Sequence, residues 1–281
     1  MVFALQFLIL TLIMPELPEV ETIRRQLEKT VIGKKIIRIE IFEPKMFIGD
    51  SNEIIGKKII SAGRSAKVLQ IILGGNLGLF IHFKLNGQLF LQTGKEKFDT
   101  RFTRIILHLD NGAKLLFNDS RKFAWMKAVK NYQEIKNNSI EPLQDNFTFK
   151  NFAAILTKSK KPIKLLLMDQ EKIAGIGNIY ANESLFSARV NPFKPANSLN
   201  PIEAKKLYKS ILQILKKAIA CHGSSGKDEW YRQLDGKIGC YQNHFLVYQR
   251  TGQKCPDSCK GQVMRQKQSG RSTFYCPICQ K

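Results

Sequence analysis

Hydrophobic and polar positions divide the chain into parts with different periods. From about residue 15 to 145, short β-branched or aromatic runs are broken by Gly, Asn and Asp, which is typical of a β-sandwich or barrel. The runs are KKIIRIEIF, KVLQIIL, LGLFIHFKL, TRIILHL and AKLLFN. One helix, ELPEVETIRRQLEKTV, is expected before them, with Pro18 in its first turn, where the missing N–H of proline costs nothing.

From about residue 148 to 222 the apolar positions recur at helical spacing. The predicted helical segments are FKNFAAILTK, KLLLMDQEKI, NIYANESLFSAR and PIEAKKLYKSILQILKKAIA. A polar stretch around 137–146 is the expected linker, and a long loop over 223–246 leads into a C-terminal segment, 247–281. The predicted fold class is therefore α+β: an N-terminal β-sandwich domain over 14–145 with a leading helix, a helical domain over 148–222, and a C-terminal hairpin.

The first 13 residues, MVFALQFLILTLI, are almost wholly apolar. They are too short to span a bilayer. They also lack the basic region and the small-residue cleavage site of a signal peptide. Since no other stretch has the length and apolarity of a membrane span, we expect no membrane association.

The charge balance narrows the class of partner. Lys and Arg number 45 against 23 acidic residues, which gives a net charge of +22. A basic surface of this size suits a polyanion, since neutralising phosphates and releasing their counterions is the usual source of nucleic-acid affinity. An RNA binder of ribosomal type and a protein that contacts anionic membranes remain alternatives at this point.

Four of the six cysteines gather near the C-terminus: Cys255, Cys259, Cys276 and Cys279. A C-x3-C pair and a C-x2-C pair have the spacing of a four-thiolate zinc ribbon, in which two tight turns supply the ligands. A disulfide framework is the alternative, but it belongs to small secreted domains. We predict one structural Zn²⁺. Cys221 and Cys240 stand apart in the sequence and are interpreted as ordinary small apolar residues.

Four motifs together resemble formamidopyrimidine-DNA glycosylase, the bacterial family that removes oxidised purines. They are MPELPEVET at 14–22, NDSRKF at 118–123, GIGNIYANESLF at 175–186 and GRSTFYCPICQK at 270–281. The resemblance covers residues 14–281 in order. It implies a β-sandwich, a helix–two-turn–helix domain and a zinc-ribbon hairpin. It also implies a monomer that acts on damaged double-stranded DNA in the bacterial cytoplasm, at the nucleoid.

The activity implied by this resemblance is base excision of 8-oxoguanine and formamidopyrimidines, followed by β,δ-elimination at the abasic site. Two other hypotheses keep the same fold. One is an endonuclease VIII-like glycosylase for oxidised pyrimidines, and the other is a non-catalytic DNA-binding zinc protein. PELPEVE and the long loop around GKIGCYQ favour the oxidised-purine branch.

The resemblance assigns the chemistry to five residues. Pro15 matches the amine nucleophile that captures C1′ as an iminium. Glu16 matches the carboxyl that protonates the sugar ring oxygen, with Glu19 a weaker candidate for the same pocket. Lys67 matches the lysine that meets the lesion phosphate and transfers protons in β-elimination. Arg271, in the zinc hairpin, matches the arginine that binds the flanking phosphates and takes part in δ-elimination.

Two residues are assigned to the phosphate backbone. Asn178 follows Gly175 and Gly177 at a helix start, where free N–H groups and the asparagine amide are expected to point at phosphate. Lys164, just upstream, is predicted to be a further phosphate contact.

Three residues match the side chains that fill the gap left by an extruded base: Leu85, Arg121 and Phe123. Leu85 stands where the family usually has methionine, and Ser120 replaces a proline. The histidine-containing contact segment of the family is RFTR here, so Arg104 is predicted to supply that DNA contact. Residues 224–242 match the loop that closes over the extruded base, with a mobile surface loop as the alternative.

The proposed chemistry places a condition on the start of the active chain. The nitrogen of a proline inside a chain is a tertiary amide without an available lone pair, so it cannot form an iminium. We therefore expect the functional protein to begin at Pro15. Residues 1–13 are then a start-site artefact or a segment removed by processing.

Overall fold

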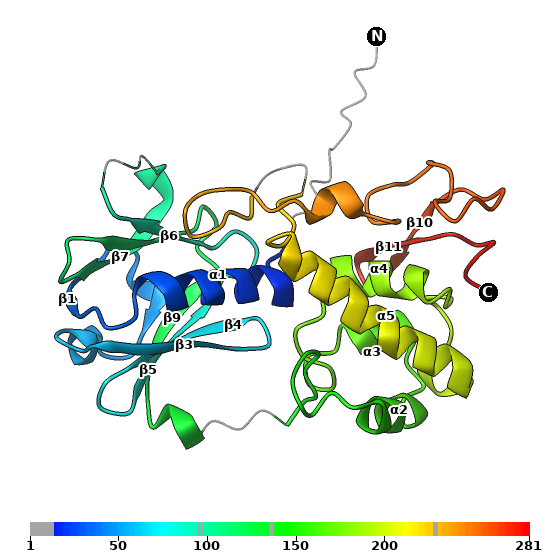
Figure 1. Cartoon of the computed structure of the whole chain (residues 1–281), viewed down its shortest axis with the longest axis horizontal. Coiled ribbons are helices and arrows are strands. Elements are labelled where there is room, and N and C mark those ends of the chain that lie inside the picture. Colours follow the sequence, from blue (N-terminus) through cyan, green and yellow to red (C-terminus); the bar gives the residue numbers. More distant parts are fainter. Residues whose placement is uncertain (1–13, 95, 97, 135–137, 227–229) are drawn as a thin grey trace, which may run out of the picture.

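The computed structural model describes residues 14–281 except 95, 97, 135–137 and 227–229. The predicted apolar segment 1–13 lies outside the described residues. Two lobes lie side by side, a β-rich lobe and a helical lobe that carries the C-terminal hairpin (Figure 1).

The elements follow the chain in this order. The β-rich lobe contains α1 (Leu17–Thr30), β1 (Ile36–Ile41), η1 (Pro44–Met46), β2 (Phe47–Ile48), η2 (Ser51–Ile54), β3 (Ile59–Ser65), β4 (Val68–Leu73), β5 (Leu77–His82), β6 (Gln88–Gln92), η3 (Thr100–Phe102), β7 (Thr103–Leu109), β8 (Lys114–Asn118), β9 (Trp125–Lys130) and η4 (Tyr132–Glu134). The rest contains α2 (Phe149–Thr157), α3 (Ile163–Leu167), α4 (Asn178–Ser187), η5 (Ala196–Ser198), α5 (Pro201–Ala220), η6 (Tyr241–His244), β10 (Met264–Gln268) and β11 (Arg271–Tyr275).

The β-rich lobe is the predicted sandwich. One sheet has the strand order β1-β7-β8-β6 and the other has the order β2-β9-β5-β4-β3. The five hydrophobic runs form β1, β4, β5, β7 and β8, and inward residues such as Leu69, Ile81 and Phe117 share one core. Strands β2, β3, β6 and β9 lie outside the predicted runs. β3 is an edge strand of its sheet. Its sequence, IISAGRS, is partly polar and contains glycine, so it lacks the run of β-branched and aromatic residues that predicts a strand.

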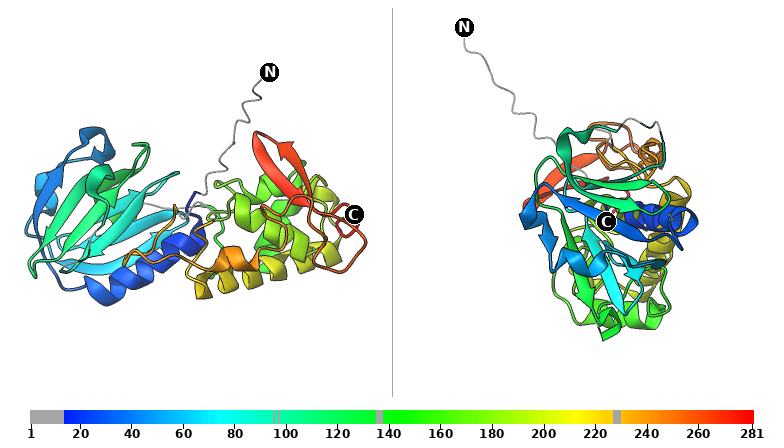
Figure 2. Two further views of the ribbon diagram at one scale, coloured as in Figure 1. Left: turned by 90° about the horizontal axis from the view of Figure 1, so that it is seen from above. Right: turned by 90° about the vertical axis from the view of Figure 1, so that its left-hand side faces the viewer.

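Helix α1 connects the two lobes (Figure 2). Leu17, in its first turn, belongs to the core of the helical lobe, whereas Val20, Ile23 and Leu27 belong to the core of the sandwich. Pro18 lies in the first turn, as predicted. The residues that begin α1 therefore lie at the junction of the lobes.

The helical lobe departs from the prediction at one point. The segment KLLLMDQEKI was expected to be helical throughout, but α3 ends at Leu167. The side-chain amide of Gln170 donates to the carbonyls of Met168 and Ile176, and its oxygen accepts from the N–H of Gly175 at 3.0 Å. These bonds stabilise a turn in place of further helix. Among the described residues, none of the helices has the length and apolarity needed to cross a membrane.

Candidate active site and DNA-facing surface

Glu16 lies at the junction and caps a helix of the other lobe. Its carboxylate accepts hydrogen bonds from the backbone N–H of Gly177 at 2.7 Å and of Ile179 at 2.9 Å, with a longer one from Tyr180 at 3.4 Å. The sequence prediction that these N–H groups are free for phosphate is therefore wrong. A Cβ atom on Gly177 would lie 2.3 Å from Glu16 Cδ, so only glycine permits this close approach. Asn178 is half-buried at the start of α4.

A second carboxyl, Glu19, lies next to Glu16 and is completely buried. It accepts hydrogen bonds from Tyr180 Oη at 2.5 Å, from the N–H of Ser224 at 2.8 Å and from the N–H of Glu16 at 2.9 Å. Burial, followed by the charge of Glu16, raises the pKa of Glu19 to about 7. Burial therefore favours the protonated form of Glu19 more than in an ordinary carboxyl group.

The side chain of Lys67 provides a positive charge near the two carboxyl groups. Burial raises the pKa of Glu16, and the Lys67 ammonium opposes that rise. In turn, burial lowers the pKa of Lys67, and Glu16 opposes that fall. Pro15 is also buried, and it lines a small cavity together with Glu19. The structure therefore brings Pro15, both carboxyls and Lys67 together, as the resemblance implied.

An ion-pair network that sequence reasoning missed holds the backbone just before Lys67. Arg64 bonds the carboxylates of Glu21 at 3.2 Å and of Glu141, and it also donates to the carbonyl of Ala66 at 2.8 Å. Glu141 comes from the linker and accepts the N–H of Ala66 at 2.7 Å. Ala66 has a φ of 52°, a strained conformation that these bonds stabilise. The linker thus helps to position Lys67.

Lys164 does not lie where the sequence prediction put it. Its side chain is fully buried, and Nζ donates to Ser272 O and Thr273 Oγ1, both at 2.8 Å. The prediction of a phosphate contact at Lys164 is therefore wrong for this conformation. Burial, followed by the charge of Arg271, lowers the pKa of Lys164 to about 7. The residue ties α3 to β11 of the C-terminal hairpin.

Two further residues of α4 hold the C-terminal segment. Asn182 Oδ1 accepts the N–H of Phe274 in β11 at 2.8 Å. The buried carboxylate of Glu183 accepts the N–H groups of Leu246, Val247 and Tyr248 at 2.7 to 3.0 Å. These two residues were not assigned from the sequence. The Asn and Glu of the NES stretch in GIGNIYANESLF could have indicated such contacts, since a polar side chain that is buried in a helix needs a hydrogen-bond partner. Arg271 is exposed at the start of the hairpin strand that these bonds fix.

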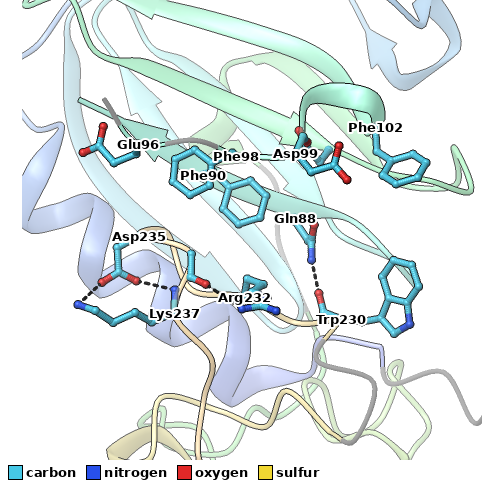
Figure 3. Close-up of a pocket in the computed structure, with 12 residues that line it drawn as sticks. Gln88, Phe90, Glu96, Phe98, Asp99, Phe102, Trp230, Arg232, Asp235 and Lys237 are labelled. Carbon is cyan, nitrogen blue, oxygen red and sulfur yellow. Dashed lines mark hydrogen bonds and ion pairs between the residues drawn. The ribbon is translucent and has the colours of Figure 1, made fainter. Parts of the chain in front are cut away.

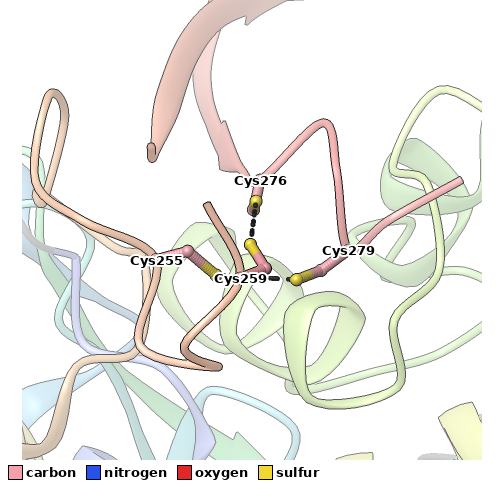
Figure 4. Close-up of side chains that lie close together, drawn as sticks. All are labelled: Cys255, Cys259, Cys276 and Cys279. Atoms are coloured by element: carbon pink, nitrogen blue, oxygen red, sulfur yellow. Dashed lines mark hydrogen bonds between the residues drawn. The ribbon is translucent and has the colours of Figure 1, made fainter. Parts of the chain in front are cut away.

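The four C-terminal cysteines lie together beside the β10–β11 hairpin (Figure 4). The Sγ atoms of Cys255 and Cys279 are 3.6 Å apart, as are those of Cys259 and Cys276. Tetrahedral zinc with Zn–S bonds of about 2.3 Å places its sulfurs roughly 3.8 Å apart, so the donor set and its spacing fit a four-thiolate metal site. A Cβ atom on Gly261 would lie 2.8 Å from Cys276 Sγ, so a glycine there gives the sulfurs room.

The predicted gap-filling residues lie on two connected turns. Asn86 Nδ2, next to Leu85, donates to Ser120 Oγ at 3.0 Å. Arg121 is exposed, Phe123 is 60% exposed and Leu85 is half-buried. Most large aromatic side chains are buried, so the exposed ring of Phe123 is not part of the core.

The turn that carries Arg121 and Phe123 is organised by a buried aspartate. The carboxylate of Asp119 accepts the N–H groups of Arg121, Phe123 and Ala124, each at 2.8 Å. Arg104 Nε donates to the carbonyl of Asp119 at 2.9 Å. The predicted DNA contact Arg104 thus supports this turn from a half-buried position.

The predicted base-recognition loop is packed against the sandwich where it is described. Tyr231, Gln233 and Leu234 are buried, and the Leu234 carbonyl accepts the N–H of Leu91 at 2.8 Å. The alternative of a mobile surface loop does not fit these residues. An open cavity of about 680 Å³ lies between this segment and β6, with Phe90 and Trp230 in its walls (Figure 3). None of the predicted catalytic residues lines it.

The chain combines a β-sandwich, a helix–two-turn–helix lobe and a four-cysteine hairpin, with a buried Pro–Glu pair between the lobes. This combination defines the class of two-lobed DNA glycosylases with a helix–two-turn–helix domain. The profile of the formamidopyrimidine-DNA glycosylase N-terminal domain matches residues 14–126, and that of the formamidopyrimidine-DNA glycosylase H2TH domain matches residues 139–229. The chain belongs to the formamidopyrimidine-DNA glycosylase family.

Individual relatives agree with this assignment. Formamidopyrimidine-DNA glycosylase of Chloroflexus aurantiacus is 40% identical over 275 residues, covering 95% of this chain and 98% of the relative. The relative from Pelotomaculum thermopropionicum is 38% identical over 278 residues, covering 95% and 99%. The crystal structure of the MutM (Fpg) protein from Thermus thermophilus has a TM-score of 0.86 at 38% identity and covers 95% of this chain and 98% of that one. The Lactococcus lactis Fpg in complex with DNA containing an abasic site has a TM-score of 0.86 at 35% identity, covering 95% and 99%.

Proposed function

We propose that this protein is a base-excision-repair DNA glycosylase that removes oxidised purines, 8-oxoguanine and formamidopyrimidines, from duplex DNA and then cuts the strand as an abasic-site lyase. The observation that carries the proposal is the buried group of Pro15, Glu16, Glu19 and Lys67 at the lobe junction. Structures of the Lactococcus lactis Fpg relative hold damaged DNA, which supports the glycosylase class: DNA with an abasic site, DNA with Fapy-dG and DNA with an oxidised pyrimidine.

In the proposed glycosylase step, the free secondary amine of Pro15 attacks C1′ of the damaged nucleoside. The glycosidic bond breaks, and the base leaves with the bonding electron pair and takes up the proton that the Pro15 nitrogen loses. Glu16 donates a proton to the ring oxygen as the sugar opens, which gives an iminium between Pro15 and C1′. The raised pKa of Glu16 suits this role, because burial favours the protonated carboxyl. Glu19, with a pKa of about 7, is placed to exchange protons in the same pocket.

In the proposed lyase step, the iminium acts as an electron sink. Lys67, whose pKa is lowered by burial, removes a proton from C2′ and the 3′ phosphate leaves from C3′. In the second elimination, water takes a proton from C4′ and the 5′ phosphate leaves from C5′, while Arg271 binds the phosphate group. The chemistry requires that the active form begin at Pro15, because the Met14–Pro15 amide nitrogen has no reactive lone pair.

Zinc has a structural role in this proposal. Cys255, Cys259, Cys276 and Cys279 would hold one Zn²⁺, which fixes the turns at the base of the hairpin and so the position of Arg271. DNA is bound as a kinked duplex, with Leu85 and Phe123 filling the gap in the stack and Arg121 facing the unpaired base. Asn178 binds a backbone phosphate at the start of α4.

The test is borohydride trapping on duplex DNA with 8-oxoguanine opposite cytosine. A chain that begins at Pro15 is expected to form a covalent adduct, and the same chain with one uncleaved residue before Pro15 is expected to form none. Since the added residue leaves every side chain in place, an adduct on the blocked chain would overturn the role of Pro15. Trapping by neither chain would favour a non-catalytic DNA-binding protein. Faster cutting of thymine glycol than of 8-oxoguanine would move the assignment to oxidised pyrimidines.

A further inference from the structure

A second group of possible metal ligands lies at the base of the predicted base-recognition loop. The ligand atoms of Cys221, Cys240 and His244 all lie within 4.8 Å of one another. Cys221 is the C-cap of α5, whereas Cys240 is the N-cap of η6 and His244 is its last residue. Cys240 and His244 are exposed and Cys221 is buried. The exposed position of Cys240 departs from the sequence interpretation of this residue as an ordinary small apolar one.

The chemistry of this group fits a thiophilic cation. Two thiolates and one imidazole are ligands that Zn²⁺ prefers, and the C-x3-H spacing of Cys240 and His244 is typical of zinc sites. Three protein ligands leave a fourth tetrahedral position for water. A structural disulfide would use only the two cysteines and leaves the nearby imidazole unexplained. We propose that Cys221, Cys240 and His244 form a second metal site, which binds Zn²⁺ separately from the four-cysteine site.

The proposed site lies where the two ends of the predicted base-recognition loop meet. The N–H of Cys240 donates to the carbonyl of Cys221 at 2.9 Å, and the N–H of Tyr241 donates to that of Gly223 at 3.0 Å. The chain thus enters and leaves the loop at one place. Ser224, just inside the loop, donates to Glu19 at 2.8 Å. A cation held by both ends would restrain the segment that contacts this carboxyl.

Native mass spectrometry of the full chain tests the proposal, with zinc supplied under phosphine reduction. The wild-type chain is expected to carry two zinc ions, and Cys240→Ser and His244→Ala are expected to carry one each. His222→Ala is the matched control, since His222 is exposed at the same loop base but outside the group, and it is expected to keep two. Because Cys240 and His244 are exposed, their replacement leaves the core intact.

Cobalt provides a second measurement. Co²⁺ added to the chain with one zinc already bound is expected to give a thiolate-to-cobalt absorption band that Cys240→Ser lacks. One zinc per wild-type chain and no cobalt band would overturn the proposal. A chain 2 Da lighter, with Cys221 and Cys240 both unreactive toward thiol reagents after the reductant is removed, would also overturn it in favour of a disulfide.

Discussion

The replacement Lys164→Met distinguishes two roles for this lysine: a buried structural link to β11, as in the structure, and a phosphate contact, as the sequence suggested. Nζ donates to Ser272 O and Thr273 Oγ1, both at 2.8 Å, and the side chain is fully buried. Methionine has a similar length but no donor. It leaves two acceptors of β11 without this partner, at a cost of about 1–3 kcal/mol each.

The size of the loss depends on pH. Burial lowers the pKa of Lys164 from 10.5 to about 7 in the folded protein. Between these two values the unfolded chain binds more protons than the folded chain, so the wild-type protein becomes more stable as the pH rises. One pKa unit corresponds to about 1.36 kcal/mol, so this contribution grows by roughly 2–3 kcal/mol between pH 7 and pH 9. The methionine variant lacks it, and its deficit is therefore larger at pH 9.

Hydrogen–deuterium exchange of the amides in residues 264–275, corrected for intrinsic rates, measures the opening of the hairpin at both pH values. Lys164→Met is expected to lower protection at pH 9 more than at pH 7. Lys160→Met, at an exposed position just before α3, is the control and is expected to change neither. Unchanged protection, together with a salt slope of DNA binding reduced by about 1, would refute the structural role and restore the phosphate contact.

Three further variants test other parts of the site. Cys276→Ser is expected to lose the zinc ion of the four-cysteine site and duplex binding while the sandwich stays folded, as measured by metal analysis, fluorescence anisotropy and circular dichroism; full duplex affinity with that site empty would contradict this. Phe123→Ala is expected to slow excision from duplex DNA several-fold more than cutting of preformed abasic sites, which contain no base to unstack, and equal losses would show that the ring does not act as a wedge. Gly177→Ala places a methyl group 2.3 Å from Glu16 Cδ, so we expect the rate of adduct trapping to fall on the order of 100-fold. Gly74→Ala, whose Cβ meets nothing nearer than 4.0 Å, is its control, and similar rates for both glycine variants would argue against the contact.

The sequence alone determined the features that depend on local pattern and short spacing. Alternating apolar residues predicted five strands of the sandwich, and helical spacing predicted α1, α2, α4 and α5, because these periods place one face of each element in a core. The cysteine pairs predicted the four-cysteine cluster, since short loops keep ligands close in any fold. Motif resemblance predicted the family and the grouping around Pro15.

Only the tertiary structure decided contacts between residues far apart in the chain. Glu16 caps α4 across 161 residues, and Lys164 reaches Ser272 across 108. Nothing in the local sequence of Lys164 distinguishes a buried ammonium from an exposed one. The same holds for Cys221 and His244, which come together because the loop between Cys221 and Cys240 returns to its starting point. Such pairs depend on how the lobes pack, and packing is set by the summed burial of many residues rather than by any one segment.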